Sequence, residues 1–216
     1  MSNQVETSIV KKIKYLLYTP SDYPGDEPYP LMIFLHGAGE RGDNLDLVKI
    51  HGPPKEIAAG WEPSFIVVSP QVAEGEWWSP STVIWILNEL KAKMNIDEDR
   101  IYLTGLSMGG YGSWDTAIRH PNIWAALVPI CGKGDPLMAE RIKHIPTWIF
   151  HGAKDSVVPF KHSQDMFDAL EGYGNARFTV YPEADHDSWT ETYSNPELFE
   201  WMLRQRRGLR SPVFPE

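Results

Sequence analysis

The sequence has almost no cysteine, no long apolar run and no excess of positive charge. Of its 216 residues only Cys131 is a cysteine, which excludes an internal disulfide. Cys131 lies in an apolar, strand-like run, so we expect a small buried side chain there. No apolar stretch approaches the roughly 20 residues that a membrane span needs, and the N-terminal MSNQVETS lacks the basic-then-apolar pattern of a signal peptide. We therefore expect a cytoplasmic protein without a membrane span, or a secreted one if a leader has been removed.

The charge balance excludes other classes of partner. A net charge of −9 argues against nucleic acid or an anionic membrane as the main partner. The one basic cluster, RQRRGLR at residues 204–210, is predicted to be a helix end followed by a solvated tail. Repeats and low-complexity linkers are also missing. The length predicts a single domain over residues 1–216, large enough to bury roughly 70% of the surface that the unfolded chain exposes.

Short apolar runs of strand type alternate with helical patterns along the chain. Buried strands are predicted at residues 31–37, 64–71, 100–104, 125–131, 147–151 and 177–181, with an edge strand at 10–18. Helices are predicted at residues 45–59, 81–94, 108–120, 160–170 and 196–206. This alternation predicts a doubly wound, mostly parallel α/β sheet with helices on both faces. No insertion between strands is long enough for a large cap domain.

The segment TGLSMGG at residues 104–110 organises the rest of the chain. It reads as a strand end, a sharp turn carrying Ser107 and a helix that begins at Met108. Gly105, Ser107 and Gly109 occupy the fixed positions of the G-x-S-x-G nucleophile elbow. A side chain two residues before or after the serine would collide with the neighbouring backbone, and glycine removes that clash. The motif is common by itself, so its interpretation depends on what accompanies it.

Two further residues complete a catalytic pattern with Ser107. Asp155 follows the predicted strand at 147–151, and His186 follows the predicted strand at 177–181. Because the carboxyl ends of parallel strands form the ligand crevice of such a sheet, all three loops should emerge at one edge. The order Ser, Asp, His is also the order found in α/β-hydrolases. The sequence therefore predicts Ser107 as nucleophile, His186 as base and Asp155 as the residue that orients the base.

Each member of this set has a simpler alternative. Asp155 could merely cap the following helix, and Asp135, Asp185 and Asp187 are rival acids. Asp155 is preferred because its strand directly precedes the strand of the histidine. His186 could be a solvated residue or a metal ligand, but no second histidine or cysteine lies at ligand spacing, so no metal is predicted.

The other histidines fit structural roles better. His36 and His151 each precede a glycine at a strand end, where we expect the ring to pack and form hydrogen bonds. His120 lies near a predicted helix C-terminus, where a histidine suits the helix dipole. None of them follows the last strand, so none competes with His186 for the role of base.

The glycine-rich loop HGAGERG at residues 36–42 follows an early strand. Such a loop can present a free backbone N–H toward the serine, and with the N–H of Met108 it would form an oxyanion hole. Ala38 is the expected second donor, with Gly39 next to it and near the substrate; the alternative is an ordinary glycine turn. Three polar residues are expected to brace this loop through an ion pair: Glu40, Arg41 and Asn44.

Tryptophan is frequent, with nine in the chain. Trp77 and Trp78 follow the strand at 64–71, and Trp189 comes just after His186. These rings could bind substrate by stacking on an aromatic or sugar-linked ester. The alternative is that they seal loops against the core.

Four segments together resemble a known superfamily: LHGAGERGDN, GLSMGGYG, HGAKDSVVP and DHDSWTETY. They are similar to α/β-hydrolases, above all to the small serine esterases of the phospholipase/carboxylesterase, polyhydroxybutyrate-depolymerase-like and feruloyl-esterase-like group, which includes predicted peptidases. The resemblance runs from about Leu31 to Leu203. It implies the roles given above for Ser107, Asp155 and His186, with Ala38 and Met108 as oxyanion donors. Dienelactone hydrolases share the fold but use cysteine at the elbow, so a serine there indicates an esterase.

The resulting expectation is a serine carboxylesterase that needs no cofactor. It would hydrolyse short-chain or aryl esters of small molecules through an acyl-enzyme, in an open groove rather than a lidded tunnel. A serine peptidase or a thioesterase could use the same three residues. A non-catalytic binding module is the third alternative, although such domains usually lack one member of the triad.

Overall fold

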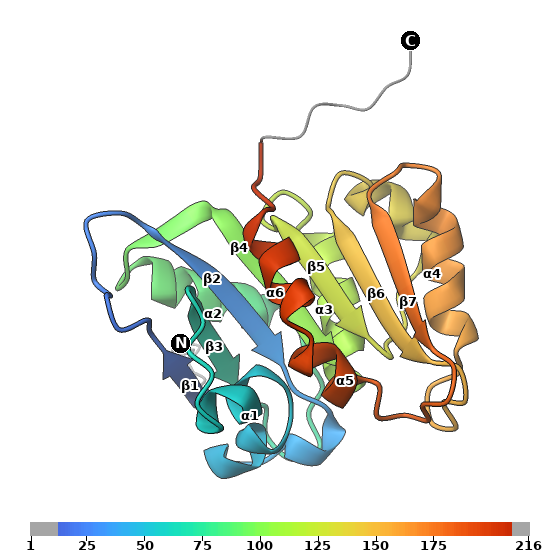
Figure 1. Cartoon of the computed structure of the whole chain (residues 1–216), viewed down its shortest axis with the longest axis horizontal. Coiled ribbons are helices and arrows are strands. Elements are labelled where there is room, and N and C mark those ends of the chain that lie inside the picture. Colours follow the sequence, from blue (N-terminus) through green and yellow to red (C-terminus); the bar gives the residue numbers. More distant parts are fainter. Residues whose placement is uncertain (1–12, 209–216) are drawn as a thin grey trace, which may run out of the picture.

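A seven-stranded sheet forms the centre of the computed structural model, which describes residues 13–208. In spatial order the strands are β1 (Tyr15–Tyr18), β3 (Ile66–Pro70), β2 (Tyr29–Leu35), β4 (Ile96–Leu106), β5 (Ala126–Ile130), β6 (Thr147–Gly152) and β7 (Ala176–Tyr181). β1 pairs antiparallel with β3, and the remaining pairs are parallel (Figure 1). The predicted doubly wound, mostly parallel sheet is confirmed. The predicted edge strand is β1, and residues 10–12 of that prediction lie outside the described residues.

Helices cover both faces of the sheet. They are α1 (Gly52–Ala58), α2 (Pro80–Lys91), α3 (Met108–Arg119), α4 (Lys161–Glu171), α5 (Trp189–Ser194) and α6 (Pro196–Leu203), with 3₁₀ turns η1 (Ala38–Glu40), η2 (Leu45–Ile50) and η3 (Pro136–Ile142). Side chains alternate along each strand, so Leu31, Ile33 and Leu35 of β2 pack with α2, α3 and α4. Met32 and Phe34 face the opposite core, which α5 and α6 cover.

This double burial explains why the central strands read as continuous apolar runs. A strand covered on both faces has no solvent side on which polar residues could alternate. Residues 31–35 of β2 and 126–130 of β5 are all buried. Within residues 13–208 no large cap domain interrupts the sheet, and none of the described helices has the length and apolar character needed to cross a membrane. That residues 1–216 form one domain stays a prediction.

Two predicted helices differ from those observed. The stretch at 45–59 divides into η2 and α1 at His51, because Gly52 has a φ of +65°, which a continuous helix does not allow. The helix predicted at 196–206 ends at Leu203. The predicted solvated tail is wrong as far as Arg207, because Arg206 and Arg207 return to the start of β4 and form ion pairs there. The last residues of the basic cluster, 209 and 210, lie outside the described residues.

The carboxyl ends of the parallel strands meet at the lower edge of the sheet in Figure 1. β2, β4 and β6 end there at Leu35, Leu106 and Gly152. In an open parallel sheet this edge forms the ligand crevice, and the loops that leave it contain the candidate site.

Candidate active site

Ser107 lies in the turn between β4 and α3, with a φ of 50° and a ψ of −116°. Few residues with a side chain adopt such a positive φ, so the surrounding structure must impose it. The two flanking glycines are part of that structure. A Cβ at Gly109 would overlap the carbonyl of Leu35, and one at Gly105 would overlap the carbonyl of Gly109. The start of α3 therefore packs directly on the end of β2, as the elbow motif predicts.

Two consecutive hydrogen bonds connect Ser107, His186 and Asp155. Ser107 Oγ is 2.9 Å from His186 Nε2, and His186 Nδ1 is 2.8 Å from Asp155 Oδ2. Because a carboxylate only accepts, Nδ1 carries the proton and Nε2 is left to accept from the serine hydroxyl. The Asp155 side chain is fully buried, whereas that of His186 is 19% exposed. Residues 79 positions apart thus meet at one edge of the sheet.

Asp155 also fulfils the simpler role that the sequence suggested. Its Oδ1 accepts hydrogen bonds from the backbone N–H groups of Val157 (2.9 Å) and Val158 (2.8 Å). The two roles use different oxygens, so the capped turn aims Oδ2 at His186. The rival carboxylates are each occupied elsewhere: Asp135 accepts from Leu137, Asp185 from Ser156, and Asp187 from Thr190.

The oxyanion loop and the elbow lie side by side. β2 and β4 are paired in register at Leu35 and Gly105, so Ala38 and Met108 each come three residues after a paired position. Ala38 begins η1 and Met108 begins α3. The first N–H groups of a helix have no partner inside it, and Ala38 and Gly39 are exposed. This arrangement is compatible with two N–H groups that point at one oxygen above Ser107.

The polar contacts that brace the oxyanion loop differ from the predicted ion pair. Glu40 is buried, and its oxygens lie 3.7 Å from His51 Nε2 and 3.9 Å from His36 Nδ1. Arg41 instead donates from Nε to the carbonyl of Ala38 at 2.9 Å. Burial raises the pKa of Glu40, and the nearby His51 opposes this effect. Asn44, the third predicted brace, caps η2 by accepting from the N–H of Asp46.

His36 supports the same loop from below. Its Nδ1 donates to the carbonyl of Gly37 at 2.6 Å, and its Nε2 accepts from the N–H of Val72 at 3.2 Å. Burial lowers the pKa of His36 to about 4. The ring is therefore neutral near pH 7 and has the structural role that we predicted.

The three predicted tryptophans occupy different environments. Trp77 is 61% exposed, and its ring lies 6.0 Å from that of Tyr111, one helical turn beyond Ser107. Trp189 packs edge-on against His186, with ring centroids 5.1 Å apart. Trp78 is only 7% exposed and donates its indole N–H to the carbonyl of His36. Trp78 therefore seals the loop against the core, the second of its two possible roles, and we do not retain it as a substrate contact.

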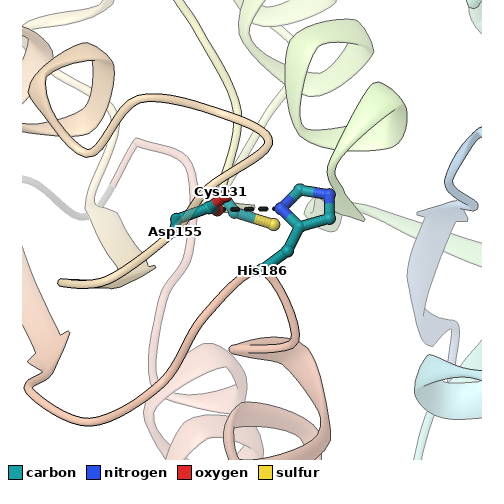
Figure 2. Close-up of side chains that lie close together, drawn as sticks. All are labelled: Cys131, Asp155 and His186. Atoms are coloured by element: carbon teal, nitrogen blue, oxygen red, sulfur yellow. Dashed lines mark hydrogen bonds and ion pairs between the residues drawn. The ribbon is translucent and has the colours of Figure 1, made fainter.

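Cys131 lies beside this constellation, directly after β5 and with a φ of 39°. Cys131, Asp155 and His186 each offer an atom that could bind a metal, all within 4.8 Å of one another (Figure 2). A metal needs the thiolate form, but burial raises the pKa of the thiol to about 12. Asp155 and His186 are also bonded to each other. We therefore assign no metal to this cluster.

Comparison with known proteins identifies the family of this chain. The sequence pattern of the dienelactone hydrolase family, an α/β-hydrolase family, matches residues 82–197, which is more than half of the chain and includes the predicted triad. The chain belongs to the dienelactone hydrolase family. It is thus a hydrolase by family, although serine occupies the elbow position where we expected cysteine in dienelactone hydrolases.

Relatives of this dienelactone hydrolase family member include several esterases. A bifunctional acetylxylan esterase/xylanase from Neocallimastix patriciarum is 26% identical over 86% of the chain and 27% of that protein. A poly(3-hydroxyalkanoate) depolymerase from Paucimonas lemoignei is 29% identical over 55% of the chain and 35% of that protein. The solved structure of a thermostable esterase is 37% identical with a TM-score of 0.79, over 90% of the chain and 60% of that structure. The chain thus spans about a third or less of these two curated relatives.

One contact in this family member was not predicted from its sequence. His151 Nε2 lies 3.1 Å from Asp155 Oδ2, the same oxygen that accepts from His186. The sequence indicated only a packed, hydrogen-bonded ring at this position. The four-residue spacing in HGAKD is the signal that could have revealed it, because a tight turn after β6 brings positions 151 and 155 together.

Proposed function

We propose that this protein hydrolyses carboxylic esters by acyl transfer to Ser107. The observation that carries the proposal is the continuous hydrogen-bond chain from Ser107 through His186 to the buried carboxylate of Asp155, at 2.9 and 2.8 Å. That chain begins at a serine held in a strained elbow. The esterases among its relatives, which include the 37% identical structure, support ester hydrolysis over other acyl transfers.

The geometry leads to a two-step mechanism. As Ser107 Oγ attacks the ester carbonyl, His186 Nε2 takes the hydroxyl proton and the carbonyl oxygen becomes an oxyanion. When the tetrahedral species collapses, the bond to the alcohol oxygen breaks and His186 gives its proton to the leaving alcohol. Water then attacks the acyl-enzyme with His186 as base. The bond to Ser107 Oγ breaks as His186 returns the proton to that oxygen, and the carboxylic acid leaves. Asp155 keeps the imidazole in the correct tautomer and stabilises its cation.

The backbone N–H groups of Ala38 and Met108 are proposed to bind the oxyanion. One such donor typically contributes on the order of 10² to 10³ in turnover. The exposure of Ala38 and Gly39 leaves room for a substrate carbonyl beside the serine. The proposed rate of acyl transfer depends on this pair of donors as well as on the triad.

The surroundings support short acyl groups and aromatic esters. Trp77 presents an exposed ring next to Tyr111, on the side of the site where α3 begins. Trp189 adds a second aromatic wall against His186. Aromatic substrates pack favourably against such rings in edge-to-face or offset arrangements. A relative named as an acetylxylan esterase acts on a short acyl group, as we propose here.

Fluorophosphonate labelling followed by mass spectrometry tests the nucleophile. We expect one adduct, on Ser107 in the intact chain, and its loss in Ser107→Ala and His186→Ala. His144→Ala is the matched control, because His144 is an exposed histidine that forms a hydrogen bond with the carbonyl of Pro121. Labelling at another serine, or undiminished labelling of His186→Ala, would contradict the proposal.

A panel of matched substrates tests the substrate class. It contains 4-nitrophenyl acetate, butyrate and decanoate, a methyl hydroxycinnamate, an anilide and a thioester. We expect the acetate and the hydroxycinnamate to be cleaved with the highest kcat/KM. A higher kcat/KM for the anilide or the thioester would indicate a peptidase or a thioesterase. A preference for decanoate would contradict the open groove.

A further inference from the structure

We propose that His151 is a positioning residue of this site, which together with Ser163 extends the proposed triad behind Asp155. The inference rests on the proposed function, because it concerns how Asp155 is held for His186. The side chains of His151 and Asp155 are fully buried, and Ser163 is buried in α4. The contacts therefore form a fixed internal series that solvent does not reach.

The first observation is the contact between the His151 ring and the carboxylate of Asp155. Nε2 of His151 lies 3.0 Å from the carbonyl oxygen of Val158 and 3.1 Å from Asp155 Oδ2. Asp155 Oδ2 therefore lies between two imidazoles, with His186 Nδ1 at 2.8 Å on the other side. Both neighbours of His151 Nε2 accept hydrogen bonds, so this nitrogen must carry the proton.

The second step is the tautomer of His151. With the proton on Nε2, Nδ1 must accept, and the Ser163 hydroxyl lies 2.7 Å from it. Ser163 thus donates to Nδ1 and keeps the N–H of His151 directed at Val158 and Asp155. Burial lowers the pKa of His151, so the ring stays neutral. A neutral ring contributes an N–H dipole beside the carboxylate without cancelling its charge.

The third step is the effect on the loop that carries Asp155. Val158 donates its N–H to Asp155 Oδ1 and offers its carbonyl to His151, so the turn is fixed from both sides. The loop of His186 packs against the same strand end, because a Cβ at Gly152 would overlap the carbonyls of Ala184 and Asp185. The end of β6 therefore sets the distance between Asp155 and His186. His151 lies at this end of β6, next to Gly152.

A testable electrostatic consequence follows. The N–H dipole of His151 stabilises the negative charge on Asp155 Oδ2, which weakens the pull of that oxygen on the proton of His186. Without His151, the protonated form of His186 gains stability, and the acid limb of the pH profile should move to higher pH. Other titratable groups near the pair stay unchanged in such a variant: Cys131, Tyr111, Asp185 and Asp187.

The experiment compares His151→Leu, His151→Gln and Ser163→Ala with the wild-type chain and with His144→Leu. His144 is an exposed histidine that follows η3 in the chain and serves as the matched control. The readouts are kcat and KM for 4-nitrophenyl acetate from pH 5 to 9, the rate of fluorophosphonate labelling of Ser107, and the midpoint of thermal unfolding. We expect His151→Leu to lower kcat by about 10- to 100-fold, by analogy with the partners that orient metal-binding histidines, whose loss costs this much activity. KM should change little.

His151→Gln should recover part of kcat and return the acid limb toward its wild-type position, because the glutamine amide can still donate to Asp155. Ser163→Ala should show the same shift in a smaller form, and it tests the inference even if His151→Leu does not fold. Unchanged kcat and labelling in folded variants would overturn the inference, as would a loss of kcat with no movement of the acid limb. Wild-type protein that is not labelled at Ser107 would instead contradict the proposed function.

Discussion

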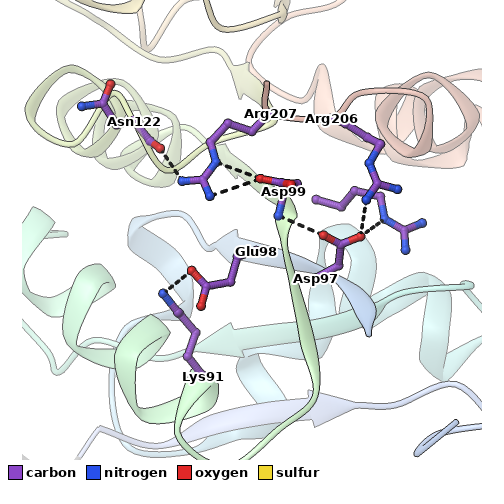
Figure 3. A network of polar contacts seen from close by, with 8 residues as sticks. Lys91, Asp97, Glu98, Asp99, Asn122, Arg206 and Arg207 are labelled. Carbon is purple, nitrogen blue, oxygen red and sulfur yellow. Dashed lines mark hydrogen bonds and ion pairs between the residues drawn. The ribbon is translucent and has the colours of Figure 1, made fainter. Parts of the chain in front are cut away.

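The two ends of the central sheet use polar groups in opposite ways. At the carboxyl end, buried histidines and single carboxylates form hydrogen bonds with fixed geometry, and the Asp155 side chain has no exposed surface. At the other end, where β4 begins, arginines and carboxylates form ion pairs that remain partly exposed (Figure 3). Carboxylates thus orient histidines at one end and attach the segment after α6 through arginines at the other.

The amino end of β4 fastens the segment that follows α6. Asp97 Oδ2 accepts from Arg100 Nε at 2.7 Å and from Arg206 at 2.9 Å. Arg207 pairs with Asp99 at 3.2 Å and also donates to the carbonyl of Asn122 at 2.7 Å. Figure 3 shows these contacts converging on the start of the strand. The bonds from Arg206 to Asp97 and from Arg207 to Asp99 join residues more than 100 positions apart in the sequence.

The difference in burial gives the two clusters different energies. Partly exposed ion pairs are screened by water and salt, and each contributes about 1 kcal/mol or less to stability. A buried, paired carboxylate costs far more to disturb, because removal of one partner leaves the other desolvated and unpaired. Substitutions at the carboxyl end should therefore affect activity, and those at the amino end should affect stability slightly.

The largest expected difference between the two ends of the sheet is in the kcat of Asp155→Asn and Asp97→Asn. An amide at 155 can donate to Nδ1 of His186 and favour the wrong tautomer, which typically lowers kcat about 10⁴-fold. Asp97→Asn should leave kcat within about twofold, because Asp97 lies at the far end of the strand that carries Ser107. Initial rates with 4-nitrophenyl acetate for both purified variants test this. Similar losses of kcat in the two variants would show that the two ends of the sheet are not functionally separate.

The elbow gives the next largest effect, now on folding. A Cβ at Gly109 would overlap the carbonyls of Leu35 and His36, so Gly109→Ala must displace α3 from β2. We expect a loss of more than about 4 kcal/mol in the free energy of unfolding, the range of severe backbone and packing defects. Gly172→Ala is the matched control, because its Cβ would meet open space and its φ is −62°. The control should stabilise by about 0.4–1 kcal/mol. Urea unfolding measures both, and a mild Gly109→Ala would contradict the close packing.

Acid should lower the stability of the fold first at the carboxyl end of the sheet, because His36 is buried there as a neutral ring. The pKa of His36 is lowered by burial to about 4, against about 6.5 in the unfolded chain. As the pH falls from 6.5 to 4, the unfolded state binds a proton that the folded state does not, so stability is lost over this window. The loss approaches roughly 3 kcal/mol. The raised pKa of the neighbouring Glu40 acts in the opposite direction, because it makes the folded state bind a proton more tightly.

A comparison of variants isolates the contribution of His36. Urea unfolding at pH 7 and pH 4.5 should give a smaller difference for His36→Gln than for the wild type, since the glutamine does not titrate. His144→Gln, at an exposed position, should keep the wild-type difference. An equal pH dependence in all three proteins would mean that His36 titrates normally in the folded chain.

Much of the fold could be predicted from the sequence, because burial on both faces leaves a direct mark on composition. β2 and β5 are apolar throughout, and glycine at 105 and 109 marks the close approach of two backbones. The candidate triad followed from chain order and from the shared edge of the parallel strands. These are local patterns combined with one topological rule, so they did not depend on the details of packing.

The rest depended on tertiary contacts that leave no local pattern. Trp77 and Trp78 are adjacent in the sequence, yet one is exposed and the other is buried under His36. The sequence predicts a solvated tail at Arg206, because no residue near it in the sequence indicates that it pairs with Asp97, 109 positions away. The sequence predicts only a structural role for His151, because the direction of its ring depends on Ser163 and Val158, which no local pattern identifies as its partners.

The smallest predicted effect concerns the amino end. Burial pushes the pKa of Asp97 up, but hydrogen bonds from Arg100 and the N–H of Asp99, with the charges of Arg100 and Arg206, outweigh it, so the pKa is lowered. A lowered pKa means that the stabilisation is present above the unfolded pKa of about 3.9 and is lost as the pH falls below it. A double-mutant cycle of Asp97→Asn and Arg206→Gln should give a coupling of about 1 kcal/mol or less at low salt.

Salt and acid then distinguish this pair from the buried carboxyl end. The coupling should shrink in 1 M NaCl, where screening acts over only about 3 Å, and it should vanish once the pH falls below the lowered pKa of Asp97, because the carboxyl group is then protonated. The hydrogen bond between Asp155 and His186 is shielded from salt, so kcat for 4-nitrophenyl acetate should change by less than about twofold over the same salt range. If the coupling between Asp97 and Arg206 changes as little with salt as kcat does, then Asp97 is as isolated from solvent as Asp155. The contrast between the two ends would then lie in their geometry alone and not in their exposure.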